Sequence, residues 1–247
     1  MSTIVITGGS RGIGASTAIE CARRGLGVIL TYNSHPLRAA EVVEQIQTEG
    51  GKAVALKLDV SEVESFHAFR DEVVDVLTRE FQARGLTGLI NNAGYGLFNP
   101  IENVTQAQFD GLLNVHLKGP FFLTQTLLPL LQEGAGIVNV TSATTRVATV
   151  GVAPYAAFKA GLEVLTRYMA KEFGERHIRV NAVSPGPVRT ELGGGLNADF
   201  ETLLAGQTAL GRIGEPEEVA RVIAMLLTAD GCWINGQSIE VAGGYII

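Results

Sequence analysis

The chain has 247 residues, of which 46% are hydrophobic and 18% are charged, and its formal net charge at pH 7 is -6. This apolar fraction is large enough for a sizeable core and excludes an intrinsically disordered chain. The acidic balance disfavours a nucleic-acid partner, because such proteins usually display a stripe of Lys and Arg.

Short β-branched runs alternate with longer segments of helical period along the chain. The runs predict strands over residues 3–7, 27–32, 53–58, 89–91, 136–141, 178–183 and 238–241. The longer segments predict helices over residues 12–24, 36–49, 62–84, 102–131, 153–174 and 216–228. This alternation predicts a single α/β domain over residues 1–247, with a parallel sheet covered by helices on both faces.

The stretch from Pro185 to Gly214 breaks this alternation, and it contains seven glycines. Long irregular segments are uncommon in compact domains and often cover a functional site. We therefore predict a mobile substrate lid at about residues 186–214.

Several features bear on the cellular compartment. Cys21 and Cys232 are too few and too far apart for a disulfide framework or a Cys-rich zinc site, and the four histidines show no metal-ligand spacing. The N-terminus lacks the pattern of a secretory signal, and no run approaches 18 consecutive apolar residues. We expect a cytoplasmic protein with no metal and no membrane span.

A glycine-rich loop, Thr7 to Gly14, joins the first predicted strand to the first helix. In this context a glycine loop brings a pyrophosphate against the N–H groups of the helix, although a simple tight connection is the alternative. A nucleoside triphosphatase loop is excluded, because no Lys followed by Ser or Thr comes after the last glycine. The predicted dinucleotide contacts are Gly8, Ser10, Arg11, Gly12, Ile13 and Gly14.

The end of the second strand bears on the choice of nucleotide. An NAD site normally places Asp or Glu there to bind the adenosine ribose, but this stretch reads Tyr32-Asn33-Ser34-His35. The absence of a carboxylate leaves room for a 2′-phosphate, which Arg11, Asn33, Ser34 and His35 can contact. The sequence therefore predicts NADPH over NADH, unless Arg11 is only a solvated loop cation.

Tyr155 and Lys159 are four residues apart on a predicted helix, so their side chains project from one face. A phenol with a pKa near 10 exchanges protons poorly at neutral pH, but a neighbouring ammonium lowers that pKa. The pair is common on helices by chance, and it indicates chemistry only together with the glycine loop.

With these motifs the chain resembles the short-chain dehydrogenase/reductase family over essentially its whole length. The ordered matches are the glycine loop, Asp59-Val60, Asn91-Asn92-Ala93-Gly94, Ser142, Tyr155-Ala156-Ala157-Phe158-Lys159 and Pro185-Gly186. The resemblance implies one doubly wound Rossmann-fold domain with a seven-stranded parallel sheet in the order 3-2-1-4-5-6-7. It also implies a homotetramer, with the fourth and fifth helices at one interface.

The resemblance further implies the roles of individual residues. Tyr155 is the general acid for carbonyl reduction, Ser142 holds the substrate oxygen, and Lys159 lowers the Tyr155 pKa and binds the nicotinamide ribose. Asn114 positions a water that passes protons to Lys159. Thr141 is the rival for the Ser142 role. The further cofactor contacts that the resemblance implies are Asp59, Val60, Asn91, Ala93, Gly94, Pro185, Gly186, Val188 and Thr190.

Apolar residues should wall the substrate pocket: Tyr95, Leu97 and Phe98, residues 147–152, and Leu192, Leu196 and Phe200 of the lid. Small or medium ketones, aldehydes and β-ketoesters fit such a pocket, and alcohol oxidation by the same residues remains open. The nearest rival is a 3-oxoacyl reductase that docks an acidic carrier protein, which the absence of Lys and Arg between Lys118 and Arg146 disfavours. A dinucleotide sensor without turnover and a serine hydrolase are weaker alternatives.

Overall fold

The computed structural model describes residues 1–195 and 197–247. Its strands form one parallel sheet in the order β3-β2-β1-β4-β5-β6-β7, as the resemblance implies. The strands are β1 Thr3–Ile6, β2 Gly27–Tyr32, β3 Ala53–Lys57, β4 Leu86–Asn91, β5 Leu131–Val140, β6 Arg179–Pro185 and β7 Ser238–Val241.

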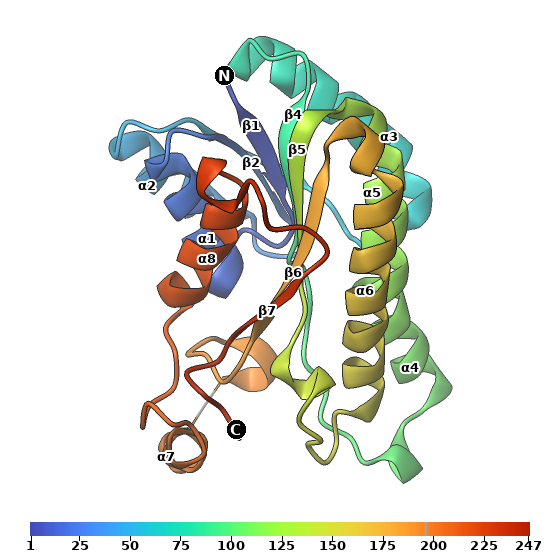
Figure 1. The fold of residues 1–247 in the computed structure, drawn as a ribbon, viewed down its shortest axis with the longest axis vertical. Helices are drawn as coiled ribbons and strands as arrows, with labels where there is room; N and C mark the ends of the chain where they lie inside the picture. Colours follow the sequence, from blue (N-terminus) through green and yellow to red (C-terminus); the bar gives the residue numbers. More distant parts are fainter. Residues whose placement is uncertain (196) are drawn as a thin grey trace.

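Helices cover both faces of this sheet (Figure 1). The helices are α1 Gly12–Arg23, α2 Pro36–Thr48, α3 Phe66–Val76, α4 Gln106–Leu113, α5 Gly119–Leu127, α6 Ala153–Glu172, α7 Ala198–Gly206 and α8 Pro216–Leu226. In Figure 1, α1, α2 and α8 lie on one side of the strands and α3 to α6 on the other, while α7 lies apart near the C-terminus. None of the helices in the two described ranges is both long and apolar enough to cross a bilayer.

Two apolar cores result from the alternation of side chains along each strand. In β1, Ile4 and Ile6 pack with α1 and α8, whereas Val5 between them packs with α3 and α5. Successive side chains of a strand point to opposite faces, and both faces are covered here, so every residue of β1 must be buried. Burial of each such side chain contributes about 1.5–3 kcal/mol to the free energy of unfolding.

The predicted helix over 102–131 is wrong in two respects. It is divided by a π turn, Asn114–Lys118, between α4 and α5, and its last residue, Leu131, begins β5. Gly119 lies against the Val60 backbone, where a Cβ would collide with the Val60 carbonyl oxygen. This close approach fixes the position of the first residue of α5 against the loop that follows β3. A second π turn, Leu77–Phe81, similarly ends the predicted helix over 62–84.

The predicted lid contains regular structure. Val188 and Gly214 form a parallel bridge at its base, with Arg189 N donating to Gly214 O at 2.9 Å and Gly214 N donating to Pro187 O at 2.9 Å. Within the segment lies α7, which sequence reasoning missed. Its signal was Asn197, whose side chain caps the helix by accepting from Phe200 N at 2.8 Å.

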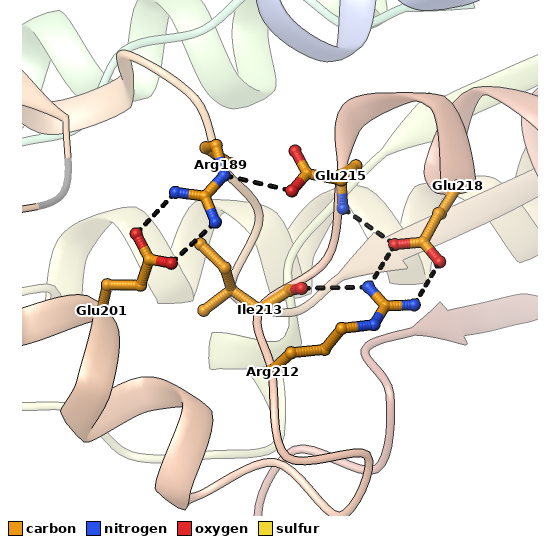
Figure 2. A network of polar contacts seen from close by, with 6 residues as sticks. All are labelled: Arg189, Glu201, Arg212, Ile213, Glu215 and Glu218. Carbon is orange, nitrogen blue, oxygen red and sulfur yellow. Dashed lines mark hydrogen bonds and ion pairs between the residues drawn. The ribbon is translucent and has the colours of Figure 1, made fainter. Parts of the chain in front are cut away.

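Ion pairs attach α7 to the base of the lid (Figure 2). Arg189 donates two hydrogen bonds of 2.6 Å to Glu201 of α7 and a third of 3.1 Å to Glu215, which precedes α8. Arg212 pairs in the same way with Glu218, whose pKa it lowers to about 2. We call these five side chains the lid clamp. All five are partly solvent-exposed, so salt screens their attraction.

Candidate active site

A cavity of about 360 Å³ opens at the carboxyl ends of the strands, where the loops after β1 to β6 converge. Ligands of open α/β sheets bind at this edge. The cavity wall contains these predicted residues: Gly8, Ser10, Arg11, Gly12, Ile13, Gly14, Asn33, Ser34, His35, Asp59, Val60, Ala93, Gly94, Ser142, Tyr155, Lys159, Pro185, Gly186, Val188 and Thr190. Among the predicted catalytic and cofactor-binding residues, Asn91 and Asn114 do not line it.

The glycine loop forms a close-fitting turn. Gly8 has a φ of +66°, and a Cβ on Gly14 would collide with the Gly8 carbonyl. Asn92 holds this turn, because its Nδ2 donates to Thr7 O at 2.9 Å and to Gly8 O at 3.1 Å. Gly12 and Gly14, in the first turn of α1, line the cavity and carry no side chain. This cradle fits the pyrophosphate of a dinucleotide.

Asn91 is buried instead of lining the cavity. Its Nδ2 donates to Thr124 Oγ1 at 3.1 Å and to Asn139 Oδ1 at 2.8 Å, and Asn139 in turn donates to Thr166 at 2.9 Å. Asn91 is the last residue of β4, and its side chain points inward as the period of the strand requires. Its side chain links β4, β5 and the helices α5 and α6, and the predicted cofactor contact of Asn91 stays a prediction.

Charged and amide groups surround the adenosine end of the cavity. Asn33 Nδ2 donates to Asp59 Oδ2 at 2.8 Å, so part of its predicted capacity to bind phosphate is already used. Burial alone would raise the pKa of Asp59, but hydrogen bonds from Ser61 and Asn33 outweigh it and lower that pKa. Asp59 is therefore an ionised acceptor at neutral pH.

Two arginines share one lid carboxylate at this end. Glu191 Oε2 lies 2.6 Å from Arg38 Nη1 and 3.4 Å from Arg11 Nη1. Together, the two arginines and Glu191 carry one net positive charge, which suits a phosphate. Arg38 is not itself a lining residue but pairs with Glu191, which is. Sequence reasoning did not single it out, and its signal was its place in the first turn of the helix after the second strand.

Ser142, Tyr155 and Lys159 come together at the other end. Ser142 Oγ caps the short turn Ala143–Thr145 by accepting from Thr144 N at 3.2 Å, and it also accepts from Thr144 Oγ1 at 2.9 Å. Its hydroxyl interacts with that of Tyr155. The rival Thr141 also lines the cavity, but its hydroxyl lies 3.0 Å from Glu163 Oε1 and 3.2 Å from Val183 O, and its single hydrogen is used on one of these two acceptors. This geometry favours Ser142 for contact with a substrate oxygen.

The pKa of Tyr155 does not follow the expectation that the Lys159 charge lowers it. Enclosure by the surrounding protein raises the pKa of Tyr155, and the hydrogen bond with Ser142 opposes this rise. Burial lowers the pKa of Lys159 to about 8, and its Nζ donates to Val140 O at 2.6 Å and lies 5.8 Å from the Tyr155 ring centroid. In the protein alone, the Ser142 hydrogen bond rather than Lys159 acts to lower the Tyr155 pKa.

Asn114 does not line the cavity, and its predicted role stays a prediction. Asn114 is half-buried at the start of the π turn and outside the cavity wall, whereas His116, two residues later, is 1% exposed and lines it. A π turn contains an extra residue per turn and so changes which side chain faces inward. The regular α-helix predicted over residues 102–131 lacks this extra residue, so it did not indicate that His116 faces the cavity.

The substrate end of the wall is only partly as predicted. Tyr95 and Leu192 line the cavity, whereas Leu97, Phe98, Phe200 and residues 147–152 are not among its lining residues. Phe98 is 59% exposed and lies against Gly193 of the lid. Leu196 lies outside the described residues.

Known proteins resemble this chain along its full length. A family model described as "Enoyl-(Acyl carrier protein) reductase" matches residues 8–246. An uncharacterized oxidoreductase of Methylorubrum extorquens is 37% identical, covering 97% of this chain and 96% of its own. A hydroxynaphthalene reductase-like protein of Metarhizium majus is 34% identical, covering 98% and 94%.

A solved structure of an angucycline C-6 ketoreductase with bound NADP superimposes with a TM-score of 0.95. It is 32% identical and covers 99% of this chain and 95% of its own. The matching sheet order, the glycine cradle and these relatives agree. The chain belongs to the short-chain dehydrogenase/reductase family of oxidoreductases.

Proposed function

We propose that this protein reduces the carbonyl group of a small or medium apolar ketone or aldehyde with NADPH, and oxidises the alcohol in reverse. One observation carries the proposal: the Tyr155–Ser142 pair, with Lys159 one turn away, lies in the same cavity as the glycine cradle. A dinucleotide on the cradle would extend from Arg11 toward Tyr155.

The glycine loop, Arg11 and Lys159 would hold NADPH, which would supply the hydride that adds to the carbonyl carbon. The residues of the chain manage the oxygen and its proton. The Ser142 hydroxyl donates a hydrogen bond to the substrate oxygen and Tyr155 gives it a proton, so that the product is a neutral alcohol. The Lys159 ammonium then stabilises the tyrosinate that remains.

The charge at the adenosine end supports NADPH rather than NADH. β2 ends without a carboxylate, Arg11 lines the cavity, and Arg38 pairs with the cavity-lining Glu191. The ketoreductase described above holds NADP. Arg11 and Arg38, which now share the Glu191 carboxylate, would hold the 2′-phosphate of NADPH.

The rival substrate is a 3-oxoacyl chain on an acidic carrier protein. Docking such a carrier needs free basic side chains near the mouth. Arg146 is instead paired with Glu240, and Arg189 and Arg212 are paired within the lid clamp. The hydroxynaphthalene reductase-like and ketoreductase relatives also support a small cyclic or aromatic ketone as the substrate.

The test is a panel of ketones, aldehydes, β-ketoesters and a 3-oxoacyl thioester, followed by the loss of NADPH absorbance. We expect turnover with apolar ketones and a higher kcat/KM with NADPH than with NADH. Equal or better efficiency with NADH would contradict the cofactor assignment. Faster reduction of the carrier-bound thioester than of every free ketone would favour the rival.

We also propose a cytoplasmic homotetramer. Its support is a set of exposed apolar side chains on α4, α5 and α6: Phe109, Phe121, Val164 and Tyr168. Gly161 does not contribute, because it packs against Leu117 of the same chain. Gel filtration with light scattering tests the assembly, and a monomeric mass would overturn it.

A further inference from the structure

The cavity wall contains a buried histidine for which the proposed reaction so far gives no role. His116 lies in the π turn after α4, and its Nε2 is 2.9 Å from the carbonyl oxygen of Tyr95. A carbonyl oxygen only accepts hydrogen bonds, so Nε2 must carry the hydrogen. Its sequence position, two residues after Asn114, gave no separate signal of a role in the site.

The other ring nitrogen of His116 is a free acceptor. Burial, followed by the charge of Lys159, holds the pKa of His116 well below its usual range, against the opposing hydrogen bond to Tyr95. The ring is therefore neutral, and with hydrogen on Nε2 its Nδ1 has a bare lone pair. Among the described residues this buried Nδ1 has no hydrogen-bond partner. Such a group needs a donor from outside the chain.

The surroundings of Nδ1 limit what that donor can be. The His116 ring stands edge-to-face against the Tyr155 ring, with centroids 4.9 Å apart and an interplanar angle of 80°. A Cβ on Gly94 would lie 3.3 Å from Nδ1, so that side of the ring faces the backbone of a predicted cofactor loop. Lys159 approaches the same tyrosine and uses one ammonium hydrogen on Val140 O. An ammonium with hydrogens to donate and an imidazole with a lone pair thus flank Tyr155.

We propose that His116 Nδ1 accepts a hydrogen bond from a water molecule held by Lys159, which makes His116 a positioning residue for the return of protons to Tyr155. The proposal rests on the function proposed above. After Tyr155 has given its proton to the substrate oxygen, the Lys159 ammonium gives a proton to the tyrosinate and becomes a neutral amine. The water then gives a proton to the Lys159 amine and takes one from solvent. His116 gains and loses no proton.

Three variants distinguish the role of the His116 hydrogen-bond acceptor from that of its aromatic ring. His116→Phe keeps an aromatic ring against Tyr155 but removes the lone pair, whereas His116→Asn keeps an acceptor oxygen. Asn114→Ala tests the competing assignment. We expect kcat of His116→Phe to fall roughly 10- to 100-fold, at the low end for a group that positions a transferred proton, with KM for NADPH within about twofold. The high-pH limb of its kcat profile should shift to lower pH, because the charged form of Lys159 loses a partner.

We expect His116→Asn to recover most of the lost kcat and the position of that limb, and Asn114→Ala to lose less than His116→Phe. Wild-type kcat and pH profile in His116→Phe would overturn the proposal. So would a larger loss in Asn114→Ala, or failure of His116→Asn to recover activity while NADPH still binds.

A measurement without turnover makes the test independent of the reaction. In ¹⁵N-histidine spectra of the whole protein, His116 should remain the neutral Nε2–H tautomer from pH 5 to 9. Its Nδ1 signal should move in Lys159→Met, since the water loses its donor. A protonated ring, an Nδ1–H tautomer or an unmoved signal refutes the proposal. If no carbonyl in the panel is reduced, the proposed function fails, and these spectra still decide the role of His116.

Discussion

The two ends of the cavity hold similar numbers of polar side chains in opposite environments. At the reacting end, Lys159 is 4% exposed and His116 1% exposed, and each makes one hydrogen bond to a backbone carbonyl. At the adenosine end, the side chains of Arg11, Arg38 and Glu191 are about half exposed and pair with one another. Desolvation therefore governs proton affinity at the first end, and screened attraction governs binding at the second.

This contrast predicts where a mutation should matter. Removing a buried group at the reacting end changes a protonation state that water cannot restore, so its effect is large and depends on pH. Removing an exposed cation weakens binding modestly, and salt reduces the difference. The following predictions test this contrast, beginning with the largest expected effect.

Tyr155→Phe removes the proposed proton donor and keeps the ring against His116. We expect turnover to fall by roughly 10³-fold or more, with NADPH affinity, measured by fluorescence titration, within about twofold of wild type. Ser142→Ala is the companion variant, and a smaller loss is expected because Tyr155 keeps its proton. Substantial residual reduction by Tyr155→Phe would show that the acid lies elsewhere.

The lowered pKa of Lys159 predicts how kcat and the free energy of unfolding change with pH. Its pKa in the folded protein, about 8, is below its ordinary value of 10.5. We expect kcat for reduction to fall as pH rises through about 8, roughly tenfold per unit above it, because the ammonium is lost. A rate profile that stays flat to pH 10 would contradict this.

The same shift has the opposite sign for stability. Between pH 8 and 10.5 the unfolded chain binds a proton at this lysine that the folded chain does not, so the Lys159 contribution to the free energy of unfolding increases with pH. The increase is at most about 3 kcal/mol. Lys159→Met should abolish it, as urea unfolding at several pH values can show. An unchanged pH dependence would mean that Lys159 is solvated in the folded protein.

Arg38→Ala tests the adenosine end. We expect KM for NADPH to rise about five- to twentyfold and KM for NADH to change by less than about twofold, since only NADPH carries the 2′-phosphate. The difference should shrink at high salt. Arg79→Ala is the matched control, because Arg79 forms an exposed pair with Asp75 in the α3 region. A rise of equal size for both nucleotides would remove Arg38 from the phosphate site.

The smallest effect is expected at the lid clamp (Figure 2). Arg189→Ala frees α7 from the base of the lid, and proteolysis of residues 197–211 should become roughly two- to fivefold faster, the range for losing exposed ion pairs. Arg23→Ala, which breaks an exposed bidentate pair with Glu49, should leave that rate unchanged. No acceleration in Arg189→Ala would mean that backbone contacts alone hold the segment.

Sequence patterns predicted the parts of the molecule that local geometry determines. The strands follow from their β-branched runs, and the glycine loop follows because few backbones allow Gly14 to pass the Gly8 carbonyl. The pairing of Glu191 with Arg11 and Arg38 could not be predicted, because the partners are 180 and 153 residues apart. His116 was missed for a different reason: hydrophobic period does not distinguish a π turn from an α-helix, and the two present different side chains.

The π turn also limits how this wall of the cavity can change. In a helix each residue adds a rotation of about 100°, so deleting one residue from 114–118 would convert the turn to regular α-helix and swing the imidazole out of the enclosure. Point substitutions leave that direction intact. Homologous chains that gain or lose one residue here should therefore differ abruptly in proton handling, whereas chains of equal length should diverge gradually.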